Sequence, residues 1–192
     1  MPADYDGDGK ADITVFRPSN GNWYRVFSNG NQISILQFGT SGDKPAVGDY
    51  DGDGKADIAV FRASNGMFYL LQTTAGYYAQ RWGGVSSVPL VADYDGNGKT
   101  DLGVSGDYIA INENAGVGIL FSGSGIAYSI SIPISEDAFS LSGDFKGSGR
   151  DSYAVFQPAN GLWRVRSISN DIVDYHFGQS GDILIRNGNA IP

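Results

Sequence analysis

The most constraining feature of this sequence is an acidic nine-residue motif that occurs four times. It reads Asp-Tyr-Asp-Gly-Asp-Gly-Lys-Ala-Asp at residues 4–12 and again at 49–57. A copy with Asn at its fifth position occupies 93–101, and a more divergent copy occupies 144–152. Internal repetition at this period indicates that each repeat builds one supersecondary unit of a larger array. The chain, treated as a single domain over residues 1–192, therefore consists of four units: 4–48, 49–92, 93–143 and 144–192.

Each unit alternates runs of β-branched and aromatic residues with turns rich in Gly, Asn and Ser. In the first unit these runs cover residues 13–17, 23–27, 32–38 and 45–48. Short runs of this composition, bounded by turn residues, predict β-strands. Four strands per 40–50 residues are typical of a propeller blade. The sequence therefore predicts an all-β fold, a β-propeller with four blades of four antiparallel strands.

The composition agrees with this class and excludes several functions. There are 28 glycines, and with no cysteine the chain cannot form a disulfide scaffold, a thiolate zinc finger or an iron–sulfur site. No apolar run approaches the ~18 residues that a membrane-spanning helix needs, so we expect no membrane insertion. The net charge of -8 argues against nucleic-acid binding. Residues 1–4 show no signal peptide, which predicts a cytosolic chain or a module of a longer exported protein.

A family resemblance rests on the first motif and the residues that follow it. The run Asp-Tyr-Asp-Gly-Asp-Gly-Lys-Ala-Asp-Ile, then Val-Phe-Arg-Pro-Ser-Asn-Gly and Trp-Tyr, resembles the VCBS/FG-GAP repeat family. Phe-Gly or Trp-Gly pairs at 38–39, 82–83 and 177–178 strengthen it. The resemblance covers the whole chain, although unit three departs from it after Leu102. It implies a β-propeller, often calcium-bearing, as in integrin heads, some fungal lectins and appendages of secreted bacterial enzymes.

Members of that family usually have seven blades, whereas this chain supplies four. Unit one lacks the strand that should precede its acidic motif. Residues 182–186 follow the turn 178–181 at the point where that strand is expected. We therefore predict that residues 183–186 and the N-terminal segment share one blade and close the ring, which removes exposed strand edges. A fragment that completes a larger propeller by oligomerisation is the alternative.

The acidic motifs have the pattern of metal sites. Carboxylates stand at positions 1, 3, 5 and 9, and glycines at positions 4 and 6 let the backbone curl so that the oxygens converge. With a backbone carbonyl at position 7, the shell contains only oxygen, which suits Ca²⁺. Solvated Asp-Gly turns are the alternative, but three regularly spaced copies favour calcium. The predicted ligands are Asp4, Asp6, Asp8, Lys10 and Asp12; Asp49, Asp51, Asp53, Lys55 and Asp57; and Asp93, Asp95, Asn97, Lys99 and Asp101.

The fourth motif lacks most of these ligands. Lys146 replaces the third-position Asp, and Ser148 and Ser152 replace two more. We expect no metal there, with the Lys146 ammonium in place of the cation. The other three motifs contain four, four and three of the 21 acidic residues. Three bound Ca²⁺ ions would therefore change the net charge from -8 to -2, so the acidity belongs mainly to the metal sites and does not form an acidic partner surface.

No catalytic motif accompanies the repeats. The one histidine, His176, stands at a variable polar position of a last strand, and no nucleophile elbow or cysteine nucleophile exists. We therefore expect no enzymatic activity, although unrecognised carboxylates of a lyase or hydrolase are a third, weak alternative. The recurring aromatic residues Trp23, Phe68 and Trp163 predict packing between blades.

The expected activity is binding. Unit three departs from the repeat pattern, and departures of this kind often carry function because insertions lie in loops. Its candidate ligand-binding residues are Tyr108, Asn112 and Asn114, although drift explains the divergence equally well. We expect a calcium-binding module, secreted or at the cell surface, that recognises a carbohydrate or a protein. A structural spacer beside other domains of a longer secreted enzyme is the alternative.

Overall fold

The structure, a computed structural model of the 192-residue chain, describes residues 3–30, 32–106, 114–133, 138–182, 185–186 and 189–190. Within these ranges the regular elements are antiparallel β-strands. None of the described residues forms a helix of the length and apolarity needed to cross a membrane. The predicted all-β class is confirmed.

Four antiparallel sheets follow one another along the chain. The first contains β1 (Ile13–Arg17), β2 (Asn22–Val26) and β3 (Ile33–Gln37). The second contains β4 (Lys44–Pro45), β5 (Ile58–Arg62), β6 (Met67–Gln72) and β7 (Gly76–Arg81). The third contains β8 (Val88–Pro89), β9 (Leu102–Ser105), β10 (Asn114–Leu120) and β11 (Ala127–Pro133). The fourth contains β12 (Phe139–Gly143), β13 (Ser152–Gln157), β14 (Leu162–Arg166) and β15 (Ile172–His176).

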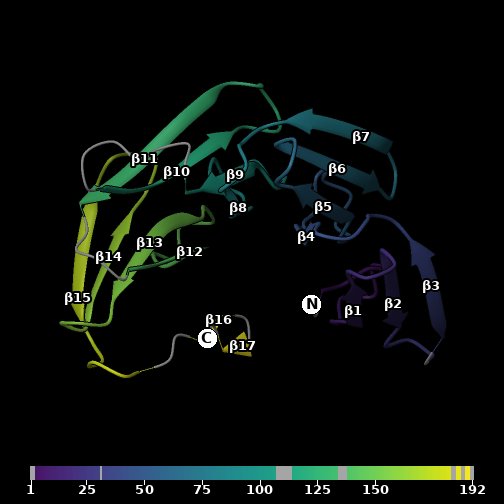
Figure 1. Cartoon of the computed structure of the whole chain (residues 1–192), viewed down its shortest axis with the longest axis horizontal. Helices are drawn as coiled ribbons and strands as arrows, with labels where there is room; N and C mark the ends of the chain where they lie inside the picture. Colours follow the sequence, from purple (N-terminus) through teal and green to yellow (C-terminus); the bar gives the residue numbers. More distant parts are fainter. Residues whose placement is uncertain are drawn as a thin grey trace.

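These sheets are the four blades of a β-propeller. Figure 1 shows them one after another around a common axis, with β4, β8 and β12 nearest the axis and β7, β11 and β15 outermost. The strand next to the axis in blades two to four comes from the preceding sequence unit. Each of the first three units therefore supplies three strands to its own blade and the innermost strand of the next, which links consecutive blades covalently.

Alternation along the strands gives each blade two apolar faces. In β5, Ile58 and Val60 point to one side and Ala59 and Phe61 to the other, and all four are buried. Ile58 and Val60 pack on Trp23 of the first blade. On the other side of the same strand, Phe61 belongs to the cluster that contains residues of the third blade. The core thus lies between blades.

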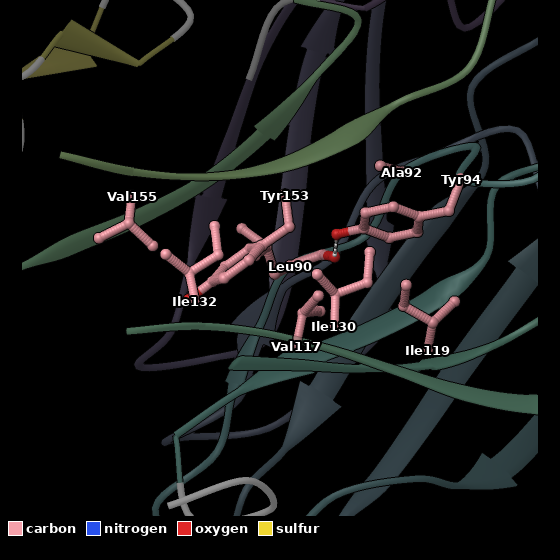
Figure 2. Packing of buried hydrophobic residues seen from close by; sticks show 9 residues of the cluster. All are labelled: Leu90, Ala92, Tyr94, Val117, Ile119, Ile130, Ile132, Tyr153 and Val155. Atoms are coloured by element: carbon pink, nitrogen blue, oxygen red, sulfur yellow. Dashed lines mark hydrogen bonds between the residues drawn. The ribbon is translucent and has the colours of Figure 1, made fainter. Parts of the chain in front are cut away.

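Figure 2 shows the interface between the third and fourth blades. Tyr153 and Val155 of β13 meet Val117 and Ile119 of β10 and two isoleucines of β11, and all of these side chains are buried. Tyr94 enters the same cluster, and its hydroxyl donates a hydrogen bond to the carbonyl of Leu90 over 2.7 Å. A phenol buried in an apolar interface needs such a partner.

The recurring aromatic residues pack as predicted in the first two blades. Trp23 and Phe68 are fully buried, and their rings lie 4.9 Å from Phe16 and 4.8 Å from Phe61. The Trp23 indole also donates to the carbonyl of Phe38. Trp163 repeats the ring contact in the fourth blade but is only partly buried. Trp163 is more exposed than Trp23 and Phe68 because no described residue of a following blade covers it.

The closing strand of the first blade was predicted from residues 183–186. Residues 183 and 184 lie outside the described part of the chain. The next two, β16 (Ile185–Arg186), pair with β17 (Asn189–Ala190). Figure 1 shows this hairpin in the opening between the fourth blade and the first. Among the described strands the first blade has three, so closure of the ring by the terminal segments stays a prediction.

Candidate metal centre and ligand cavity

The four acidic loops occupy the same place in every blade. Each directly precedes β1, β5, β9 or β13, and in blades two to four this is the second strand counted from the axis. In the first three blades an isolated bridge joins the ends of the loop: Ala3 with Asp12, Gly48 with Asp57 and Ala92 with Asp101. The loops are therefore held at their ends by the sheet and are short enough to keep one shape.

The first carboxylate of each loop organises the backbone. One oxygen of Asp4 accepts the Gly7 N–H over 2.6 Å, and the other accepts the Gly9 N–H over 2.8 Å. Both glycines have left-handed φ values of 83° and 82°, which side chains with a Cβ rarely adopt. Asp144 accepts the N–H of Gly149, the counterpart of Gly9, over 2.8 Å, and the N–H of Ser148 over 3.0 Å. The fourth loop therefore keeps this fold although it has lost most of its acidic residues.

Carboxylate groups come together in the first three loops. The members of each group have ligand oxygens within 4.8 Å of one another: Asp4, Asp6 and Asp8; Asp49, Asp51 and Asp53; and Asp93, Asp95 and Asp101. Two oxygens bound to one Ca²⁺ at 2.3–2.6 Å lie at most about 5.2 Å apart, so these spacings fit a shared ion. The all-oxygen donor set also fits Ca²⁺.

The ninth-position aspartates have a structural task. Asp12 is buried, and its two oxygens accept the N–H groups of Tyr5 and Ser28 over 2.8 and 2.9 Å. Asp57 and Asp101 receive equivalent N–H groups, and burial raises the pKa of both. These residues hold the acidic loop against the turn that follows the second strand after it, between β2 and β3 in the first blade. Metal coordination by all of the predicted ligands stays a prediction, and Asp12, Asp57, Asn97, Lys10, Lys55 and Lys99 are not members of the three carboxylate groups.

That second turn contributes contacts that the sequence analysis missed. The Ser28 hydroxyl donates to Asp8, and the hydroxyls of Thr73 and Thr74 donate to Asp53. The two threonine hydroxyls, with the Lys55 N–H, lower the pKa of Asp53 to about 2. Hydroxyl-bearing residues 24 positions after the start of the first and second motifs, Ser28 and Thr73, were the available signal. They hold the fifth-position carboxylate ionised and oriented.

The loops are connected to one another around the axis. The Ala56 N–H donates to the carbonyl of Asp4 over 2.7 Å, and the Thr100 N–H donates to that of Asp49 over 2.6 Å. A third bond of this kind joins Asp151 to Asp93 over 2.7 Å. The backbones of consecutive acidic loops are therefore linked directly by hydrogen bonds.

In the fourth loop Lys146 forms an ion pair with Asp171 of the turn after β14. This contact lowers the pKa of the Asp171 carboxyl. The ammonium group thus pairs with a carboxylate beside the acidic loop, and its place in the cation position stays a prediction. Lys146 and Asp171 occupy positions that the first blade fills with Asp6 and Gln32.

A cavity of about 500 Å³ lies between the second and third blades. Its apolar lining includes Leu70, Tyr78 and Phe121, and its polar lining includes Gln80 and Asp51 of the second acidic loop. Tyr78 is about half exposed, and its hydroxyl donates to the Gln80 amide oxygen over 2.8 Å. An exposed ring beside amide and carboxylate groups can hold a ligand with both apolar and hydroxyl-bearing faces.

Of the three predicted binding residues of unit three, only Asn114 lies in the described part of the chain. Tyr108 and Asn112 lie outside the described residues. Asn114 is the first residue of β10, where its backbone pairs with Pro133. His176 lies exposed at the end of β15. The cavity was missed because it is formed by two blades, and spacing within one unit does not show which faces of two units meet.

The FG-GAP-like repeat family matches residues 4–60, from the first acidic loop into β5. No curated protein and no solved structure matches the chain. The matched stretch contains one repeat and the start of the next, and the remaining blades repeat its strand order and its loop geometry. The chain is therefore a four-bladed β-propeller whose residues 4–60 match the FG-GAP-like repeat family.

Proposed function

We propose that this chain is a non-catalytic, calcium-stabilised module that recognises an extracellular carbohydrate in the cavity between its second and third blades. The observation that carries the proposal is the mixed lining of that cavity. Sugar rings present C–H faces that pack on aromatic side chains and hydroxyls that bond to amides and carboxylates. FG-GAP-like repeats are generally non-catalytic and typical of extracellular proteins, which supports a binding role in that environment.

The second acidic loop and the cavity share one residue. Asp51 belongs to the second carboxylate group and also lines the cavity. One of its oxygens accepts the N–H groups of Thr74 and Ala75, each over 2.9 Å, and Ala75 is a second cavity residue. An ion held by Asp51 would therefore fix the wall of the cavity. Calcium sites of extracellular modules commonly have Kd values of about 10⁻⁴ to 10⁻³ M, which external calcium can fill.

A glycan-array screen in millimolar calcium, repeated with a chelator, tests the proposal. We expect a carbohydrate that binds with calcium and loses at least about 10-fold in affinity without it. Tyr78→Ala should weaken the same binding by about 10-fold or more, because one well-packed aromatic contact contributes roughly 1.4 kcal/mol or more. Tyr77→Ala is the matched control, since Tyr77 is exposed on the neighbouring strand position outside the cavity. A folded protein that binds no glycan, or binds equally well with Tyr78→Ala, would contradict the proposal.

The fourth loop offers a gain-of-function test of the calcium sites. Lys146→Asp with Ser148→Asp restores acidic residues at positions 3 and 5 on a backbone that already has the fold of the other loops. We expect one additional bound Ca²⁺ per chain, measured by titration calorimetry. Lys146→Gln with Ser148→Asn is the control, because it removes the ammonium group without adding carboxylates. No increase with the acidic pair would show that the motif positions alone do not make the site.

A further inference from the structure

The first blade exposes an apolar face that every other blade buries. In blades two to four the first residue of this face is Ile58, Leu102 or Tyr153, each at most 5% exposed. Its counterpart in the first blade, Ile13, is 70% exposed. Two positions further along the strand, Val60 of the second blade is fully buried, whereas its counterpart in the first blade, Val15, is 56% exposed.

Strand register extends this face across the whole first sheet. Ile13 pairs through Val26 with Ile33, and Val15 pairs through Tyr24 with Ile35. Ile33 and Ile35 are 74% and 62% exposed. We name this surface, formed by Ile13, Val15, Tyr24, Val26, Ile33 and Ile35, the entry face. It corresponds to the face with which blade two packs on blade one, so its exposure is unusual within this fold.

The fourth blade exposes the complementary face. The aromatic residue at position 2 of the acidic loop is buried as Tyr50 and Tyr94 but 38% exposed as Phe145. Phe177 is 78% exposed, whereas its counterparts Phe38 and Trp82 are partly buried. Around them lies a cluster with the same ring pair, Phe156 and Trp163, that other blades cover. We name this surface, formed by Phe145, Trp163, Tyr175 and Phe177, the exit face; the ring of the buried Phe156 packs on Trp163.

An ion pair joins the first two blades, and the residues equivalent to its two partners lie one at the entry face and one on the exit side of blade four. Arg62 donates to both oxygens of Asp43 over 2.8 and 2.9 Å, and this pair joins β5 to the turn that leads from blade one. The counterpart of Arg62 is Arg17, which stacks on Tyr24 and contacts no carboxylate in the described part of the chain. The counterpart of Asp43 is Asp182.

The turn that contains Asp182 has the geometry of a turn between blades. Asp43 accepts the Thr40 N–H over 2.9 Å and donates its own N–H to the Thr40 carbonyl over 3.2 Å. Asp182 makes the same two bonds to Gln179, over 2.9 and 3.1 Å. The chain therefore leaves blade four as it leaves blade one, directed to a following blade.

We propose that the following blade is the first blade of a second copy of this chain, so that copies associate head to tail with the exit face of one on the entry face of the next. Arg17 of one copy then pairs with Asp182 of the other. A second copy covers both faces without altering the three interfaces already formed within the chain, whose cores are close-packed. A contact between two different surfaces of this kind generates a ring when its rotation closes.

Charge reversal and mixing test the proposal on the 192-residue chain. By light scattering we expect the wild type at twice the monomer mass or more. Arg17→Asp or Asp182→Arg should each weaken association by about 30-fold or more, the lower limit for a broken interfacial charge pair. Mixing these two variants should restore the assembled mass, because each contact in the mixture then joins an arginine to an aspartate.

Two further variants separate association from folding. Val15→Asp should dissociate the assembly and leave the melting curve of the monomer unchanged, because Val15 is solvent-exposed within one chain. Ile126→Asp is the matched control, since Ile126 is 60% exposed outside both faces and its change should leave the mass unaltered. A monomeric wild type would overturn the proposal. So would a mixture that stays dissociated while one chain carrying both reversals is rescued, which is the signature of a chain that closes on itself.

Discussion

Chelation of calcium is expected to lower the Tm of this protein by about 16–32 °C. At a ligand concentration near 100 times Kd, one site that binds only the folded state adds ~2.7 kcal/mol to the free energy of unfolding. Three independent sites together add about 8 kcal/mol. For a chain of this length each kcal/mol changes Tm by about 2–4 °C. Differential scanning calorimetry in 10 mM calcium and in excess chelator measures the change.

The cause is the charge of the loops without an ion. Three carboxylates whose oxygens lie within 4.8 Å of one another repel, and hydrogen bonds from the second turn keep Asp53 ionised. Magnesium is the control, because it demands a tighter octahedral shell and holds its water, so it should restore much less of the Tm. A melting curve that chelator leaves unchanged would show that hydrogen bonds alone hold the loops.

Truncation of Trp23 is expected to destabilise the protein by about 3–5 kcal/mol, or about 6–20 °C in Tm. Trp23 is fully buried between the first two blades, where it packs on Phe16 and belongs to the cluster that contains Ile58 and Val60. Trp23→Ala removes these contacts, and the rigid neighbours cannot fill the space. Denaturant unfolding followed by circular dichroism measures the loss.

Trp23→Phe is the matched control for this prediction. It keeps an aromatic ring against Phe16 but removes the indole N–H that donates to the Phe38 carbonyl over 2.8 Å. The Phe variant should therefore lose less than the Ala variant, because it leaves a smaller cavity. A Trp23→Ala protein as stable as the wild type would contradict the assignment of the core to the spaces between blades.

The sequence predicted those elements whose determining residues all lie within one repeat unit. The position-2 tyrosine, the glycines with left-handed φ and the carboxylates at positions 1, 3 and 5 recur within nine residues, and the structure brings them together in the first two loops. In the third loop, where Asn97 replaces an acidic residue, the group instead includes Asp101. The strands followed from β-branched runs between glycine turns for the same local reason.

The features that the sequence did not predict depend on contacts between units. The cavity combines Tyr78 of β7 with Phe121 next to β10, and Val15 is exposed because no described residue of another blade covers it. The hydroxyl of Thr73 meets Asp53 across the blade, although 20 residues separate them. A repeat pattern shows that such positions are equivalent, but only the arrangement of the blades shows which of them have a neighbour.

The most direct test of the calcium assignment is a count of the ions bound by the purified chain. Titration calorimetry of the metal-free protein should give a stoichiometry of three Ca²⁺ per chain, and Asp51→Asn should reduce it to two with little change in the other sites. The same protein should bind no more than three, because Lys146 occupies the fourth loop. A folded chain that binds no calcium at millimolar concentration would contradict the assignment of these loops as metal sites.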